Sequence, residues 1–412
     1  MGRVILIICL LVSGGPVAWA APWPMIRGEM SGELVMNGPG SFPPLRWTLK
    51  AEPELAGNAA QLTVTAPGLQ LEAITAGPDS AGVLTWRVTA GELDLATWWR
   101  RLADHAGVAG LPADLACRGT VRLSGEGTWR DGVATGRLEA AIANGAIGSE
   151  AQNWNVPAFT ATAEVALVDE AVLVQTLTVD AATATVLGVT LRQIELKAAG
   201  DEQQRLLITS AGVDALGGRI TLKPFAVDPL NPVIDTTAEM VGVSLSQLAA
   251  LVPEALKEAS GQVSGRVDVK WSASLGPKTG TGALKVTPES PANFRLAATP
   301  GFLTQHAPER IQVLPDWLGA LAHWLSLENP AYETLHRIEM GEMALQVEDL
   351  SIELYPDGPQ GPRSAAVAVT ARPADGTVVE KVTFAINVAG PLDQVLRLGT
   401  SGGVKLDFGS SR

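Results

Sequence analysis

Apolar and polar residues alternate with a period of two along much of the chain. In one segment the apolar side chains of Val263, Val267, Val269 and Trp271 fall opposite those of Arg266, Asp268 and Lys270. In another, Val382, Phe384 and Ile386 fall opposite Lys381, Thr383 and Asn387. One apolar face and one solvated face are typical of strands in antiparallel sheets. The pattern therefore predicts a mainly β protein.

The strands follow one another through turns rich in Gly, Pro and Asp, and these signals together predict roughly 20 strands. In the segment that starts at Met343 the alternation slips at Glu348-Asp349 and resumes at Leu350, which predicts a β-bulge. So many strands favour an elongated, curved antiparallel sheet, which forms either a U-shaped groove or a sandwich-like core.

About three short amphipathic helices interrupt the strands. The first is predicted to start after Asp94 and the second after Ser244, because Asp and Ser are good N-cap residues. The third is predicted over residues 314–325, ending near Asn329-Pro330, with an apolar stripe that includes Trp317, Leu318, Leu321 and Trp324. Each stripe is explained either by packing on the sheet or by a lid over an apolar channel.

A strand motif occurs twice, in residues 119–129 and 261–271. Each copy begins with Gly, ends with Trp, follows a predicted helix and precedes a second strand that opens with Thr-Gly. We interpret residues 91–150 and 242–297 as an internal repeat, typical of an architecture that grows by stacking units. Residues 21–412 are predicted to form one elongated domain, with soft boundaries near 211–214 or 288–291.

The N-terminal residues resemble a secretory signal. Arg3 precedes an apolar run, and Ala18-Trp19-Ala20 fits the small-x-small cleavage pattern, so residues 1–20 are predicted to be removed after Ala20. Retention of this segment as an anchor is the alternative. After cleavage Cys117 is the single cysteine, so no internal disulfide is expected. The sequence predicts a periplasmic or envelope-associated protein.

Composition and motifs argue against several function classes. The net charge of −13 and the pI of about 4.9 disfavour nucleic acid and electrostatic binding to anionic lipid surfaces as partners. No histidine pair has metal-ligand spacing, and His105 and His323 fall on polar helix faces, where solvent exposure is expected. Nucleophile-elbow and phosphate-loop motifs are also missing from the sequence. We therefore predict no catalytic residue, no metal and no cofactor, although counting carboxylates leaves a glycosidase pair open.

The order of several motifs resembles the YdbH-like family. They are the Gly-Gly-Arg-Ile strand at 217–220, the helix opening at 242–245, the strands at 261–265 and 280–284, and the closing segment 387–396. This family is also called the dicarboxylate-transport (DctA-YdbH) domain and is related to AsmA-like and TamB-like envelope proteins. The resemblance is clearest over about residues 160–400. Typical members are longer and carry an N-terminal membrane helix.

The resemblance implies a long β sheet with a hydrophobic groove, passage of phospholipid between the membranes of a diderm bacterium, and an outer-membrane lipoprotein as partner at a strand edge. Our leading hypothesis is a non-enzymatic periplasmic lipid-binding or lipid-transfer protein. The alternatives are a structural or scaffolding β protein of an outer-membrane complex and an envelope carbohydrate-active enzyme. The predicted groove-lining residues are Val263, Val267, Val269, Trp271, Val382, Phe384 and Ile386, and the predicted groove-end helix carries Trp317, Leu318, Leu321 and Trp324.

Overall fold

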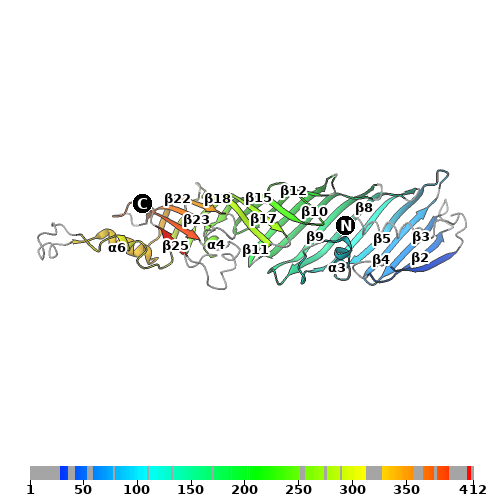
Figure 1. Cartoon of the computed structure of the whole chain (residues 1–412), viewed down its shortest axis with the longest axis horizontal. Coiled ribbons are helices and arrows are strands. Elements are labelled where there is room, and N and C mark those ends of the chain that lie inside the picture. Colours follow the sequence, from blue (N-terminus) through cyan, green and yellow to red (C-terminus); the bar gives the residue numbers. More distant parts are fainter. Residues whose placement is uncertain are drawn as a thin grey trace. The chain divides into compact units, whose positions relative to one another are not determined.

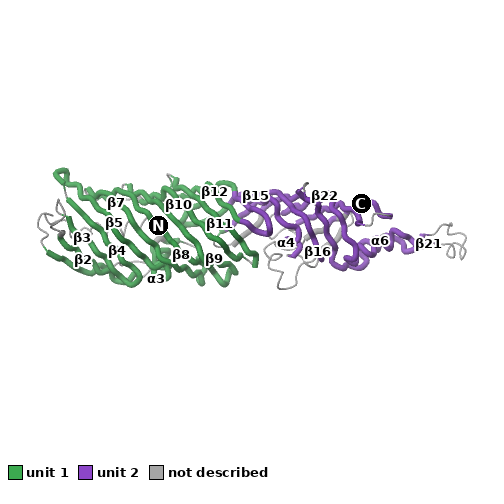
Figure 2. The backbone as a smooth tube through the Cα atoms, turned by 180° about the vertical axis from the view of Figure 1, so that it is seen from behind, with its two compact units in different colours: residues 1–213, 223–234, 272–276 green, residues 214–222, 235–271, 277–412 purple. Residues whose placement is uncertain are grey.

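A computed structural model describes most of the chain in two compact units (Figures 1 and 2). The described residues are 28–35, 42–52, 59–77, 79–108, 111–130, 133–168, 171–186, 188–201, 203, 205–250, 256–272, 276–287, 290–311, 327–355, 365–374, 378–388 and 406–409. Strands dominate them, every strand pairing given in register is antiparallel, and the sheet is open. The predicted mainly β, antiparallel fold with a few short helices is confirmed.

Unit 1 comprises residues 1–213, 223–234 and 272–276. Its strands are β1 (Glu29–Leu34), β2 (Leu45–Glu52), β3 (Ala59–Ala66), β4 (Leu69–Ala76), β5 (Leu84–Asp94), β6 (Ala116–Arg118), β7 (Thr120–Arg130), β8 (Val133–Ser149), β9 (Trp154–Val168), β10 (Ala171–Val186), β11 (Val189–Gly200), β12 (Leu206–Ala215) and β14 (Phe225–Val227). Apart from β6, the strands from β1 to β11 pair in chain order, so neighbours in sequence lie side by side (Figure 1).

The packed core of unit 1 lies on the inner face of β2–β5 and on adjoining parts of β8–β10. Trp86 is 5% exposed, and its indole covers Gly127 of β7 and Gly136 of β8. A Cβ atom at Gly127 would stand 2.5 Å from Cζ2 of Trp86, and one at Gly136 would stand 2.7 Å from it. Glycine inside these two strands therefore makes room for an aromatic side chain of a third.

Unit 2 comprises residues 214–222, 235–271 and 277–412. Its strands are β13 (Gly218–Leu222), β15 (Val233–Ser244), β16 (Leu256–Ser260), β17 (Gln262–Ser272), β18 (Gly276–Val286), β19 (Asn293–Leu296), β20 (Arg310–Ile311), β21 (Leu327–Glu328), β22 (Leu345–Leu354), β23 (Ala365–Pro373), β24 (Val382–Val388) and β25 (Leu406–Gly409). The β22–β23 register shifts between Val347 and Asp349, so the predicted bulge is confirmed. Glu348 at the bulge forms ion pairs with Arg372 and with Lys381.

Two of the described helices begin where the sequence predicts. Helix α3 (Leu95–Ala106) has Asp94 as its N-cap, and α4 (Leu245–Ala249) has Ser244. A third described helix, α6 (Pro330–Glu339), was not predicted and begins at the Asn329-Pro330 pair. The helix predicted over residues 314–325, expected to end near this pair, lies outside the described residues. Asn329 caps α6 by accepting a hydrogen bond from the amide of Ala331 at 3.1 Å, and Pro330 stands at N1.

The two segments of the predicted repeat have the same order of elements. The order strand, helix, short strand, two long strands is β5-α3-β6-β7-β8 in unit 1 and β15-α4-β16-β17-β18 in unit 2. In both copies the first amide of the helix donates to the glycine that opens the motif, Leu95 N to Gly119 O at 2.8 Å and Leu245 N to Gly261 O at 3.0 Å. Both glycines have positive φ, +128° and +109°. The motif glycine thus anchors the helix start to the following strand.

Candidate functional site: an apolar face in unit 1

A row of apolar side chains crosses five neighbouring strands of unit 1 in direct cross-strand register. We call Val121, Ile142, Ala161, Val179 and Leu196, one from each of β7 to β11, row 1. The adjacent row 2 consists of Leu123, Ala140, Ala163, Leu177 and Ala198. With neighbouring strands about 4.8 Å apart, each row extends over about 19 Å. We refer to the two rows together as the two-row face.

The two-row face is only partly covered by protein. All of row 1 is half-buried, and in row 2 only Ala198 is buried. On one side the face continues into the packed core through Leu138 and Val165, which are 5% and 4% exposed. On the side of β5, row 1 continues to the buried Leu93, which pairs with Val121. The structure therefore joins a closed core to an accessible apolar surface on one sheet face.

The opposite face of β7–β9, together with the adjoining face of β5, carries charged residues. There Arg87 pairs with Glu126 at 3.0 Å, Arg122 lies 3.8 Å from Glu92, and Arg137 pairs with Glu164. These ion pairs are solvent-exposed and run across strands, so they contribute little each to stability but keep this face hydrated. Alternation along each strand thus separates an apolar wall from a charged one.

The predicted groove-lining residues lie in unit 2 and have different environments. Val263, Val267 and Val382 belong to a packed core with Leu245, Leu284 and Ile338, and are 0%, 3% and 7% exposed. Val269 and Trp271 in β17 are half-buried. Phe384 and Ile386 lie in β24, and only the backbone of these two residues is described. Their role in lipid binding stays a prediction.

Other predicted features either fall outside the described residues or differ from expectation. The predicted groove-end helix with Trp317, Leu318, Leu321 and Trp324 lies outside them, as does His323. His105 is half-buried and packs edge-on against Phe42, with 5.2 Å between ring centroids, so the expected solvent exposure is wrong. The cause is Phe42, whose ring comes from a segment more than fifty residues earlier in the chain.

A buried carboxylate in unit 2, that of Glu339, has a structural role. Glu339 of α6 is 1% exposed and accepts hydrogen bonds from the amides of Leu303 and Thr304 at 2.9 and 3.1 Å and from the Thr304 hydroxyl at 2.9 Å. Burial by itself would raise its pKa, but these hydrogen bonds and one with His336 outweigh it and lower the pKa to about 2. Glu339 therefore ties α6 to the 3₁₀ turn Thr304–His306 as a permanent anion.

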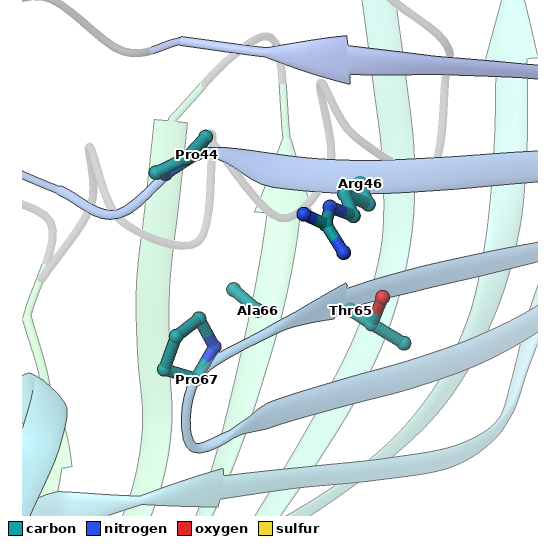
Figure 3. A pocket seen from close by; sticks show the side chains of 5 residues that line it. All are labelled: Pro44, Arg46, Thr65, Ala66 and Pro67. Atoms are coloured by element: carbon teal, nitrogen blue, oxygen red, sulfur yellow. The ribbon is translucent and has the colours of Figure 1, made fainter.

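A small pocket lies on the polar side of unit 1. It has a volume of about 300 Å³ and is lined by Pro44, Arg46, Thr65, Ala66 and Pro67 (Figure 3). Arg46 and Thr65 are directly paired between β2 and β3 and are both exposed. The pocket shares no residue with the two-row face. Among the described residues, no group of three or more His, Cys, Asp or Glu side chains is placed to hold a metal ion.

Comparison with known families fits an apolar binding surface. A sequence model described as YdbH-like, intermembrane phospholipid transport protein YdbH, matches residues 44–276, more than half of the chain. The chain belongs to the YdbH-like family. The function of that family is lipid transport between membranes. No curated protein and no solved structure shows significant similarity to the chain.

The YdbH-like match covers the two-row face completely, since rows 1 and 2 lie between residues 121 and 198. It begins earlier than the resemblance read from the motifs, which was clearest over about residues 160–400, and it ends at residue 276. A family relationship of residues 277–400 stays a prediction. In the described part of the chain, every helix is too short or too polar to cross a membrane.

Proposed function

We propose that this chain is a non-catalytic lipid carrier of the cell envelope that holds phospholipid acyl chains on the two-row face. The observation that carries the proposal is the continuous, half-buried apolar surface of β7–β11 inside the region matched by the YdbH-like family. Its length of about 19 Å exceeds the roughly 15 Å of one bilayer leaflet, so an acyl chain finds apolar contact along its extent.

The proposal places the protein in the periplasm after removal of residues 1–20. Pairing with an outer-membrane lipoprotein at a strand edge is part of it, on the strength of the family resemblance alone. A structural role is favoured for unit 2 by one observation, the packed core around Val263 and Leu345, which are both 0% exposed. In that arrangement unit 2 supports the carrier, and unit 1 holds the lipid.

A matched pair of substitutions in β10 tests the lipid site. Val179→Gln places an amide within row 1, whereas Thr178→Gln places the same amide one residue away, on the charged face. Loss of a valine-sized apolar contact costs about 1.4 kcal/mol, which corresponds to about tenfold weaker lipid binding. Lipid that co-purifies with the mature protein, extracted and quantified by mass spectrometry, should fall for Val179→Gln and remain for Thr178→Gln.

Thermal unfolding of both variants controls for folding. The proposed carrier function would be refuted if the wild-type protein carried no lipid and took up none from vesicles. Equal loss of lipid in the two variants, at unchanged stability, would place the lipid elsewhere than on the two-row face.

A further inference from the structure

We propose that the two-row face selects lipids by their acyl chains and is indifferent to their headgroups. This inference rests on the proposed function and specifies the substrate class of the same site. A carrier that reads the headgroup needs cations, or amide groups at a helix N-terminus, beside the apolar surface. The candidates for such groups are the arginines near the two-row face and the N-terminus of α3.

Every residue of rows 1 and 2 is apolar, and the charged residues next to them along the strands, such as Arg122, Asp180 and Lys197, alternate onto the other side of the sheet. Two arginines of these strands, Arg122 and Arg137, lie there beside Glu92 and Glu164. A lipid phosphate whose chains lie on the two-row face is thus separated from these guanidinium groups by the thickness of the sheet.

The helix terminus that borders the face is already occupied. Row 1 leads through Leu93 to the start of α3, whose positive end would attract a phosphate. The carboxylate of Asp94 accepts from the amides of Ala96 and Thr97 at 3.3 and 3.1 Å and from the Thr97 hydroxyl at 2.6 Å. The amide of Leu95 donates to Gly119 O. The protein's own anion therefore fills the position that a headgroup would take.

A competition experiment tests this indifference. Mature protein is incubated with vesicles that contain equal amounts of phosphatidylethanolamine, phosphatidylglycerol and phosphatidylcholine with identical acyl chains, and the bound lipid is identified by mass spectrometry. We expect bound fractions within about twofold of the supplied ratio, at low and high salt alike, because no charged contact contributes. Enrichment of one headgroup by about tenfold or more, equivalent to one charge-assisted contact, would overturn the inference and leave the carrier function standing.

A second arm tests the position of Asp94. Asn is an equally good N-cap, so Asp94→Asn preserves α3 while it removes the negative charge. We expect phosphatidylglycerol to become enriched at least about twofold in the variant, since the helix end is then uncompensated. An unchanged ratio would overturn the assignment of Asp94. Absence of all three lipids from the wild-type protein would instead refute the proposed function itself.

Discussion

At the scale of single residues, the protein separates side chains that hold the fold from side chains that offer a surface. Glu339 is the strongest example of the first kind, since a carboxylate that is 1% exposed requires hydrogen bonds to offset its loss of water. Val179 is an example of the second, because its side chain, like the rest of row 1, is only half-buried. The exposed fraction of a side chain thus indicates whether its substitution should change stability or binding.

Glu339 should make the protein acid-sensitive. Its pKa is lowered from 4.5 to about 2 on folding, which corresponds to roughly 3 kcal/mol of stabilisation. Because the folded-state pKa is the lower one, this contribution is complete above about pH 4.5 and is lost as the pH falls towards 2. Glu339→Gln should lower the free energy of unfolding at pH 7 by about 2–3 kcal/mol and flatten its decline in acid.

Urea denaturation at several pH values measures this effect, with Glu342→Gln as the control, because Glu342 is exposed three residues further along the chain. A wild-type protein whose stability is the same at pH 7 and pH 3 would contradict the role given to Glu339.

At the scale of elements, the two helix starts of the repeat differ in how they are capped. Asp94 forms side-chain hydrogen bonds to the first turn of α3, whereas the Ser244 side chain caps no amide and instead bonds to Ser246 at 2.7 Å. Asp94→Ala should therefore cost about 1–2 kcal/mol and Ser244→Ala less than about 0.5 kcal/mol. Chemical denaturation compares them, and equal costs would show that the cap hydrogen bonds of Asp94 are not what stabilises α3.

A motif glycine and a glycine outside the motif give a second comparison. A Cβ atom at Gly261 would lie 2.6 Å from Cβ of Ala292, whereas one at Gly301 would meet nothing within 4 Å, and both residues have positive φ. Gly301→Ala should cost about 1 kcal/mol through backbone strain alone. Gly261→Ala adds a steric clash and should cost at least about 3 kcal/mol. Thermal unfolding of the two variants tests whether Gly261→Ala is the more destabilising. A larger loss of stability for Gly301→Ala would contradict this prediction.

The sequence predicts those elements whose signals are local. The bulge at Glu348 follows from a slip in alternation, and α3 and α4 follow from Asp94 and Ser244 as caps. Helix α6 was missed although Asn329 and Pro330 are good residues for a helix start, because an apolar stripe that leads up to them suggested a helix end. The open face was missed for a different reason. Val263 and Val179 have the same alternation, and only pairing with distant strands decides which one is buried.

At the scale of the whole molecule, the strands of the predicted repeat are buried to different degrees in the two units. In unit 2 the β17 residue Val263 is fully buried among Leu245, Leu345 and Ile338. In unit 1 the motif strand β7 carries Val121 and Leu123, which are only half-buried, with Val121 packed at the margin of the core. The strand of the predicted repeat therefore serves as a core strand in one unit and as part of the proposed lipid wall in the other.

This division predicts opposite phenotypes for two small substitutions. Val263→Ala creates a cavity in a closed core and should lower the free energy of unfolding by about 2 kcal/mol while the folded protein keeps its lipid. Val179→Gln should leave stability within about 0.5 kcal/mol and lose most of the lipid. Denaturation curves and lipid mass spectrometry on both proteins measure the two effects. The opposite result, in which folded Val263→Ala protein loses its lipid and Val179→Gln protein keeps it, would contradict the proposal. The acyl chains would then bind in unit 2, at the groove-lining residues predicted from the sequence, and β7–β11 would have a structural role.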